Sequence, residues 1–129
     1  MTLSELLGRP VPFAELLGLR FVPADPGLAR QELELRPELL NSFQDAHGGV
    51  VTTLADVALA VAAITRDGAA RGAITVNLSV SFVGPGRGRL VAEARCLRSG
   101  RELAFSEGEV RDAAGELVAK AVGTFKLRR

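Results

Sequence analysis

The stretch VVTTLADVALAVAAITRDG, residues 50–68, decides the fold of this chain. Its alanines and leucines predict an α-helix, and Gly68 marks the end of that helix. Apolar side chains lie almost all the way round the helix, so we expect it to be buried rather than half-exposed. Its most apolar part, Val50–Ile64, contains Thr52 and Asp56 and is shorter than the roughly 20 apolar residues of a membrane span. The helix is therefore expected in a protein core and not in a bilayer.

Segments with the two-residue periodicity of β-strands lie on both sides of this helix. One strand is expected before it, over residues 28–36, and four after it, over residues 74–82, 89–98, 101–111 and 116–127. Turns at residues 84–88, 99–100 and 112–115 separate the last four strands, so three successive hairpins predict an antiparallel sheet. A helix this apolar needs a sheet that curls around it. The sequence therefore predicts an α+β fold, with the helix on one face of an antiparallel sheet.

The alternation in residues 74–82 is the clearest of the strand patterns. Two-residue spacing places Ile74, Val76 and Phe82 on one face, and Thr75 and Asn77 on the opposite face. We therefore expect a half-buried strand whose apolar face meets the core.

Length and composition limit the class of protein. The chain has 129 residues, which suits a single domain, residues 1–129, with a helical lead-in over residues 1–27. Hydrophobic residues make up 47% and charged residues 24%, as in globular proteins, so a largely disordered chain is excluded. The formal net charge of +1 argues against a dedicated nucleic-acid binder. The N-terminus lacks a basic start followed by an apolar block, so we expect no signal peptide, no membrane partner and a cytoplasmic protein.

Cysteine and histidine are scarce in this sequence. The one cysteine, Cys96, can form neither an internal disulfide nor a cysteine metal cluster, and we expect it to pack as a small hydrophobic residue. With His47 as the only histidine, a zinc site would have to rely on carboxylates. We therefore expect no metal site.

The polar segment Asn41–Gly49 leads directly into the helix. A helix N-terminus presents free N–H groups and a partial positive charge. Gly48 and Gly49 would let a ligand approach the backbone closely, so that these N–H groups polarise a carbonyl and hold an oxyanion. The alternative is that the two glycines only permit a sharp turn into the helix. We expect the side chain of His47 to bond to the backbone and fix the loop, whereas Asn41 either orients a water or forms a turn.

Asp56 is the one charged residue in the apolar part of the helix. Burying a lone carboxylate is costly unless it is paired or used, and a carboxylate there suits a general base or a nucleophile. The alternative is an aspartate bonded to a neighbouring hydroxyl or facing solvent. Gly48 and Asp56 are separated by roughly 12 Å along the helix axis, which one side chain cannot span. If both residues act on the same carbonyl, they come from different chains, so we expect a dimer with two shared sites.

The run Asn41-x5-His47-Gly48-Gly49-x6-Asp56, followed by a strand and Gly84-Pro85, resembles the hotdog-fold acyl-CoA thioesterases. It is most similar to the branch that includes the phenylacetic-acid-degradation thioesterases and the human thioesterase superfamily member 2, and the resemblance runs from about Leu28 to Leu127. It implies a sheet wrapped around a central helix, homodimers with two interfacial sites, and pairing of dimers into tetramers. It also implies hydrolysis of acyl-CoA thioesters to free acid and CoA, with no cofactor beyond the CoA of the substrate.

The resemblance implies a role for each residue of the run. Asp56 matches the catalytic carboxylate, which attacks the thioester or deprotonates a water. Gly48 matches the residue whose backbone N–H polarises the thioester carbonyl, and Asn41 matches the amide that helps to place the water or substrate. His47 matches the histidine beside that glycine. Thr75 falls where the human-type enzymes carry a serine that assists the aspartate.

The resemblance also implies a path for CoA. Asn77 and Phe82 lie on the strand along which the pantetheine arm runs in relatives. The hairpin Arg98-Ser99-Gly100-Arg101 lies near the CoA nucleotide and its phosphates, which arginine binds with two parallel hydrogen bonds. The alternative is that this hairpin is a solvated tip. Arg87, in the turn at residues 84–88, is a further candidate for a phosphate.

Two other functions remain open from the sequence. A non-catalytic acyl-CoA-binding domain of a lipid-sensing repressor would carry a DNA-binding segment, but the residues before position 28 contain no basic recognition helix. A dehydratase or hydratase of the same fold relies on a histidine with a carboxylate, whereas His47 directly precedes two glycines, as in the thioesterases. Phe43, Val51 and Leu54 are expected beside an acyl group that the sequence does not specify.

Overall fold

The computed structural model describes all of residues 1–129. The chain opens with two short helices and contains one long helix within a series of strands. In chain order the elements are α1 (Leu3–Leu7), α2 (Pro12–Leu17), β1 (Arg20–Val22), β2 (Leu28–Glu34), the 3-10 turn η1 (Pro37–Leu39), α3 (Gly48–Asp67), β3 (Gly72–Phe82), β4 (Arg89–Ser99), β5 (Leu103–Arg111) and β6 (Leu117–Arg128).

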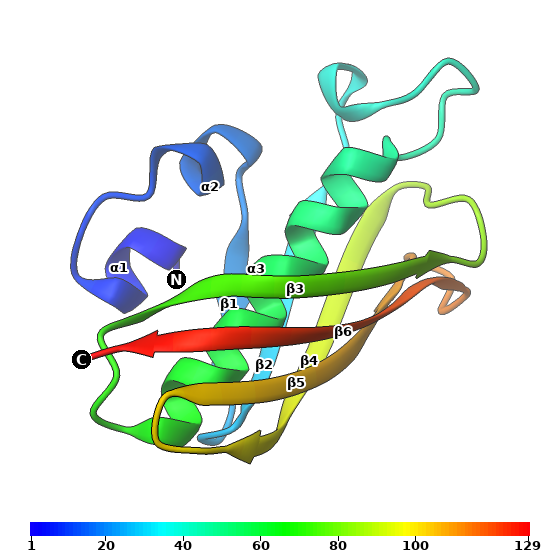
Figure 1. Cartoon of the computed structure of the whole chain (residues 1–129). Helices are drawn as coiled ribbons and strands as arrows, with labels where there is room; N and C mark the ends of the chain where they lie inside the picture. The colour runs from blue at the N-terminus through cyan, green and yellow to red at the C-terminus, as the bar shows by residue number, and fades with distance from the viewer.

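The six strands form a single sheet in the order β1-β2-β4-β5-β6-β3, and every neighbouring pair is antiparallel. The sheet curls around α3, which crosses one of its faces (Figure 1). The predicted α+β fold, an antiparallel sheet around one long helix, is confirmed.

The sequence prediction missed the strand β1. This strand has three residues and pairs with β2 from Arg20 opposite Glu32 to Val22 opposite Arg30. The lead-in over residues 1–27 is therefore not purely helical. Three residues carry too little periodicity to be recognised, because the segment becomes a strand through its pairing with β2 rather than through its own pattern.

The strand β3 does not form a hairpin with β4, so one of the three predicted hairpins is wrong. β3 pairs with β6 at the edge of the sheet, while β4 lies between β2 and β5. The intervening residues 83–88 pass the ends of β5 and β6, a shift of three strand spacings or about 14 Å, which six residues can span. One side of β3 is consequently left without a neighbouring strand.

The turn between β4 and β5 is longer than predicted. Ser99 ends β4 and Leu103 begins β5, so Arg101 lies in the turn and not in a strand. The N–H of Gly100 donates to the carbonyl of Leu103 at 2.7 Å and closes the turn.

The close contact between α3 and the sheet centres on Leu59. A Cβ added at Gly108 would lie 3.0 Å from one methyl of Leu59, and a Cβ at Gly123 would lie 3.2 Å from the other. Many small side chains are buried with Leu59: Ala29, Ala92, Ala94, Ala104, Ala119 and Ala121 on the sheet and Ala55, Ala58, Ala62 and Ala63 on the helix. Leu59 therefore fills the space above two glycines, and the helix packs closely against the sheet.

Only one side of α3 is covered by the sheet. Nine of its residues are buried, but a stripe at three- and four-residue spacing stays partly exposed: Thr53, Asp56, Val57, Ala60 and Ile64. The prediction that the helix is buried all round is therefore wrong for a single chain.

By length and composition alone, α3 could cross a membrane. It has 20 residues and contains a window of mean hydropathy 1.8, so the prediction that it is too short and too polar is wrong on these criteria. Its packing assigns it to the core instead, because the sheet covers one face of the helix along its length.

A bulge in β3 changes which of its side chains face α3. Thr75 is opposite Phe125 and Asn77 is opposite Thr124, so Val76 has no partner of its own. Directly paired residues share a face of a sheet, and Phe125 is fully buried, so Thr75 lies on the helix side and Asn77 on the outer side. The predicted uninterrupted alternation, with Thr75 facing away from the core, is therefore wrong.

The edge position also leaves β3 more exposed than predicted. Ile74 is 48% exposed, Val76 59% and Phe82 58%, so no apolar face of this strand is fully buried in one chain. These side chains are available to a neighbouring molecule.

We expect the Gly108→Ala substitution to destabilise the fold. The new Cβ would stand 2.5 Å from the carbonyl oxygen of Glu93, which belongs to the backbone and cannot rotate away. The expected loss in the free energy of unfolding is about 1–3 kcal/mol, the usual cost of overpacking, measured by urea denaturation. Gly48→Ala is the matched control, since its Cβ would meet only a side-chain ring at 3.6 Å. Equal stability of the two variants would contradict the close contact.

Candidate active site

The loop before α3 is built around Asn41. Its side-chain oxygen accepts the N–H of Phe43 at 2.8 Å and the N–H of Asp45 at 3.1 Å. Its own N–H donates to the carbonyl of Asp45 at 2.7 Å. Asn41 thus closes a tight turn, and only its side-chain NH2 group is left to contact a water or substrate.

The same loop is fastened to the connection between β3 and β4. Arg87 donates to the carboxylate of Asp45 at 2.6 Å, and the N–H of Ala46 donates to the carbonyl of Gly86 at 2.9 Å. The hydrogen bond from Asp45, followed by its negative charge, raises the pKa of Arg87 above its ordinary value. Arg87 is therefore engaged within the chain, whereas the sequence suggested it as a phosphate ligand.

His47 is the N-cap residue of α3. Its Nδ1 accepts the N–H of Gly49 at 2.9 Å, so the ring fixes the loop through the backbone. A Cβ at Gly49 would lie 3.1 Å from that same Nδ1. Gly49 is therefore explained by the cap, because a side chain there would push the histidine ring out of place.

Gly48 has no such explanation within the chain. It is the first residue of α3, and it is absent from the glycines with positive φ, so the turn does not require it. A Cβ there would meet the ring of Phe82 at 3.6 Å, an ordinary contact. Its N–H donates to no group of this chain and lies at the positive end of the helix. Gly48 therefore presents an uncovered donor that can bind a carbonyl oxygen or an oxyanion.

Asp56 lies on the uncovered side of α3, where Thr75 reaches it from β3. The hydroxyl of Thr75 donates to Oδ1 of Asp56 at 2.7 Å. The bulge at Val76 makes this contact possible, because it places Thr75 on the helix side of the sheet. The carboxylate is half-buried, and its Oδ2 accepts no hydrogen bond from the chain, so one oxygen remains available for a proton.

A single chain does not bring the N–H of Gly48 and the carboxylate of Asp56 together. Gly48 and Asp56 both lie on α3, separated by about 12 Å along the helix axis.

A hollow of about 760 Å³ lies on the face of the sheet turned away from α3 and contains none of the predicted catalytic residues. No three His, Cys, Asp or Glu side chains are grouped closely enough to hold a metal ion.

The residues predicted for CoA lie in three different places. Phe82 stands beside Gly48, whereas Asn77 faces the outer side of the sheet together with Thr124. Arg98, Ser99, Gly100 and Arg101 lie beyond the opposite end of α3, where Arg129 pairs with Asp67 and donates to the carbonyl of Arg101 at 2.7 Å.

Sequence reasoning missed the support that Asp45, Arg87 and Arg129 provide, because each acts through a residue distant in the sequence.

Comparison with known proteins identifies the family. Residues 43–119 match the model of the Thioesterase superfamily. The chain belongs to the thioesterase superfamily. A relative from Deinococcus radiodurans, with a provisional esterase name, is 38% identical over 117 residues, which cover 90% of this chain and 79% of that protein. Human acyl-coenzyme A thioesterase 13 is 29% identical over 119 residues, 89% of this chain and 84% of that protein.

Solved structures of other proteins have the same fold. The PaaI protein of the Escherichia coli phenylacetic acid degradation operon superposes with a TM-score of 0.87 at 23% identity, over 98% of this chain and 91% of that chain. A protein from Thermus thermophilus gives a TM-score of 0.80 at 35% identity, over 93% and 99% of the two chains. The hotdog fold and the resemblance to the thioesterases are both confirmed.

We expect Thr75→Val to lower thioester hydrolysis while leaving the fold intact. Valine keeps the shape of threonine but cannot donate to Asp56. Without this donor the carboxylate is no longer held in one orientation, and misplacement of a reacting group slows the reaction, so kcat should fall at least about tenfold. Thr75→Ser keeps the donor and should retain most of the activity. Equal rates for the valine and serine variants would remove this hydrogen bond from the mechanism.

Proposed function

We propose that the protein hydrolyses acyl-CoA thioesters to the free acid and CoA. The observation that carries this proposal is that α3 presents both an uncovered N–H at Gly48 and a carboxylate at Asp56 with one free oxygen. These are the two groups that acyl transfer to water requires, an oxyanion donor and a base or nucleophile. The name of the human relative, an acyl-coenzyme A thioesterase, supports the CoA thioester as substrate.

In the proposed reaction the thioester carbonyl oxygen accepts the N–H of Gly48. Asp56 then acts in one of two ways. As a general base, its free oxygen takes a proton from the attacking water. As a nucleophile, it forms an acyl anhydride that water later cleaves. In both cases the tetrahedral oxyanion is held at the positive end of α3, and the CoA thiolate leaves.

The proposed site needs two copies of the chain. Asp56 and Gly48 cannot reach one carbonyl within a single chain, since about 12 Å of helix separates them. The partly exposed apolar residues of α3, Val57, Ala60 and Ile64, offer a surface for the α3 of a second copy. The free side of β3 offers backbone groups for pairing at the same edge. We therefore propose a homodimer with two shared sites, which can pair further into a tetramer.

The position of His47 favours hydrolysis over hydration or dehydration. Its Nδ1 is occupied by the N–H of Gly49, and the imidazole caps the helix. Use of Nδ1 as a base would require this cap to break. The carboxylate that remains, Asp56, suits attack on a thioester.

We expect Asp56→Asn to abolish most of the activity. The amide keeps the shape and can still accept from Thr75, but it cannot attack or deprotonate water. The expected fall in kcat is at least about a hundredfold, with a much smaller change in KM, measured by thiol release from a panel of acyl-CoA thioesters. A variant with near-normal turnover would exclude Asp56 from the chemistry. A wild-type protein that binds acyl-CoA without releasing thiol would support a binding domain instead.

We also expect two inactive variants to restore activity when they form mixed dimers. Gly48→Pro removes the backbone N–H at the first position of a helix, where proline is well tolerated. A dimer of one Gly48→Pro chain and one Asp56→Asn chain would contain one site with both defects and one intact site. Each mixed dimer should therefore show up to half of the wild-type rate.

The matched control for this experiment is the mixture of each variant with itself, which should stay inactive. Mixed dimers can be isolated by giving the two chains different affinity tags. Folded, demonstrably mixed dimers without activity would show that Gly48 and Asp56 do not share a site.

A further inference from the structure

The peptide group that carries the N–H of Gly48 is held through its carbonyl by two hydrogen bonds. This carbonyl belongs to His47, and it accepts the N–H of Val50 at 2.9 Å and the N–H of Val51 at 3.1 Å. The first turn of α3 therefore fixes the plane of the peptide group. The N–H of Gly48 keeps its direction toward an oxyanion only while that turn keeps its shape.

The next peptide group links this turn to the side chain of His47. The hydroxyl of Thr52 donates to the carbonyl of Gly48 at 2.8 Å. On the same peptide group, the N–H of Gly49 donates to Nδ1 of His47 at 2.9 Å. Hydrogen bonds in such a chain polarise and strengthen one another. The imidazole is thus the acceptor that closes the turn around Gly48.

This arrangement requires one protonation state of the imidazole. In the neutral ring one nitrogen is an acceptor and the other carries the proton, whereas in the imidazolium both nitrogens are donors. Nδ1 of His47 can therefore accept the N–H of Gly49 only when the ring is neutral and its proton is on Nε2. An imidazolium would also place a positive charge at the positive end of α3, which is unfavourable.

The segments around His47 offer no free carboxylate to an imidazolium. The first turn of α3 contains no acidic residue, and β3, whose last residue packs against that turn, contains no charged residue. In the loop and in the connection between β3 and β4, Asp45 pairs with Arg87 at 2.6 Å, and Glu38 meets Arg36 at 3.5 Å. No carboxylate lies within 4.0 Å of the imidazole.

We propose that His47 is a positioning residue whose protonation controls the oxyanion donor: the neutral ring keeps the N–H of Gly48 in place, and the imidazolium lets it move. This inference rests on the proposed function, since it concerns the donor of the same site. The helix start is held above the titration range of histidine, roughly pH 5–8, and is loosened below it. In the proposed dimer, Asp56 of the second copy would approach Gly48, and its charge is common to all the variants compared below.

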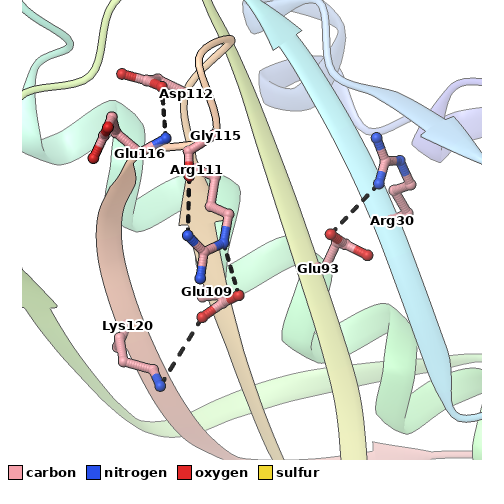
Figure 2. Close-up of polar contacts among 8 residues, drawn as sticks. All are labelled: Arg30, Glu93, Glu109, Arg111, Asp112, Gly115, Glu116 and Lys120. Atoms are coloured by element: carbon pink, nitrogen blue, oxygen red, sulfur yellow. Dashed lines mark hydrogen bonds and ion pairs between the residues drawn. The ribbon is translucent and has the colours of Figure 1, made fainter.

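Few other groups of this protein change charge in that range. His47 is the only histidine, and carboxylates ordinarily titrate near about pH 4. Carboxylates on the outer face of the sheet are also paired with cations, as Figure 2 shows for Glu109 with Arg111 and Lys120. The N-terminal amino group titrates at the upper end of the range, but it is the same in every variant. A pH effect that depends on residue 47 therefore belongs to the imidazole.

The test compares four variants by thiol release from an acyl-CoA, from an alkaline end at about pH 8 to an acid end at about pH 5.5. His47→Ala removes the cap. His47→Asn replaces it with a cap that does not titrate, because an asparagine oxygen also accepts an N–H at a helix start. Thr52→Val loosens the same turn without removing a titrating group, and Glu109→Gln is the control on the outer face. Circular dichroism checks that each variant folds at both ends of the range.

At the alkaline end, we expect His47→Ala to lower kcat at least about tenfold, with a smaller change in KM, and His47→Asn to recover most of that loss. From the alkaline to the acid end, kcat of the wild type should fall at least about fivefold, and kcat of His47→Asn less than about twofold. Thr52→Val should lower kcat by the same factor at every pH, and Glu109→Gln should keep the wild-type profile. An acid loss of equal size in the wild type and His47→Asn would assign it to another group, such as Asp56, and overturn the proposal.

Two measurements without substrate separate this proposal from the proposed function. Nitrogen NMR of the single histidine should show an unprotonated Nδ1 and a protonated Nε2 at the alkaline end. From the alkaline to the acid end, the melting temperature should fall further in the wild type than in His47→Asn, by roughly 2–8 °C, the scale expected for one helix cap. If the protein hydrolyses no thioester but shows this pattern, the proposed function fails and the titrating cap stands. A protonated Nδ1 at the alkaline end, or an equal fall in melting temperature, would overturn the proposal whatever the enzyme activity.

Discussion

The contact of Leu59 with Gly108 and Gly123 sets the distance between the helix and the sheet, and the rest of the structure depends on that distance. Because glycines face Leu59 and several alanines lie among the other buried residues, α3 packs closely against the sheet. The proposed acyl site lies on the other side of the helix, where Asp56 and the stripe around Val57 remain partly exposed. The close contact on one side of α3 thus leaves the other side for the proposed site.

Hydrogen bonds within the loop that leads into α3 hold the backbone around Gly48 in place. Asn41, Asp45 and His47 use most of their polar atoms within the chain, through the turn, the Arg87 pair and the helix cap. The backbone N–H of Gly48 stays free, as does the side-chain NH2 group of Asn41. The polar residues of this segment thus serve mainly to hold one N–H in position, an arrangement typical of a preorganised oxyanion site.

Much of the fold could be predicted from the sequence because it follows from local periodicity. The apolar residues of α3 and the alternation in β2, β4, β5 and β6 identify those elements within a few residues. The separation of Gly48 and Asp56 along one helix could also be predicted, since the rise per residue is known. The place of β3 at the sheet edge could not, because strand order depends on contacts between distant segments. β1, with three residues, and the Gly100–Glu102 turn are likewise fixed by pairing and not by their own composition.

The bulge at Val76 divides β3 into two parts with opposite phase. Before it, odd-numbered residues such as Thr75 face the helix, and after it even-numbered residues such as Leu78 do. A single deletion in this strand would therefore exchange the hydroxyl beside Asp56 for a different side chain without altering any residue of the helix. In this protein, the partner of the carboxylate can be changed by the length of a strand as readily as by a substitution. Alignments of relatives that ignore gaps within β3 would assign that partner to the wrong residue.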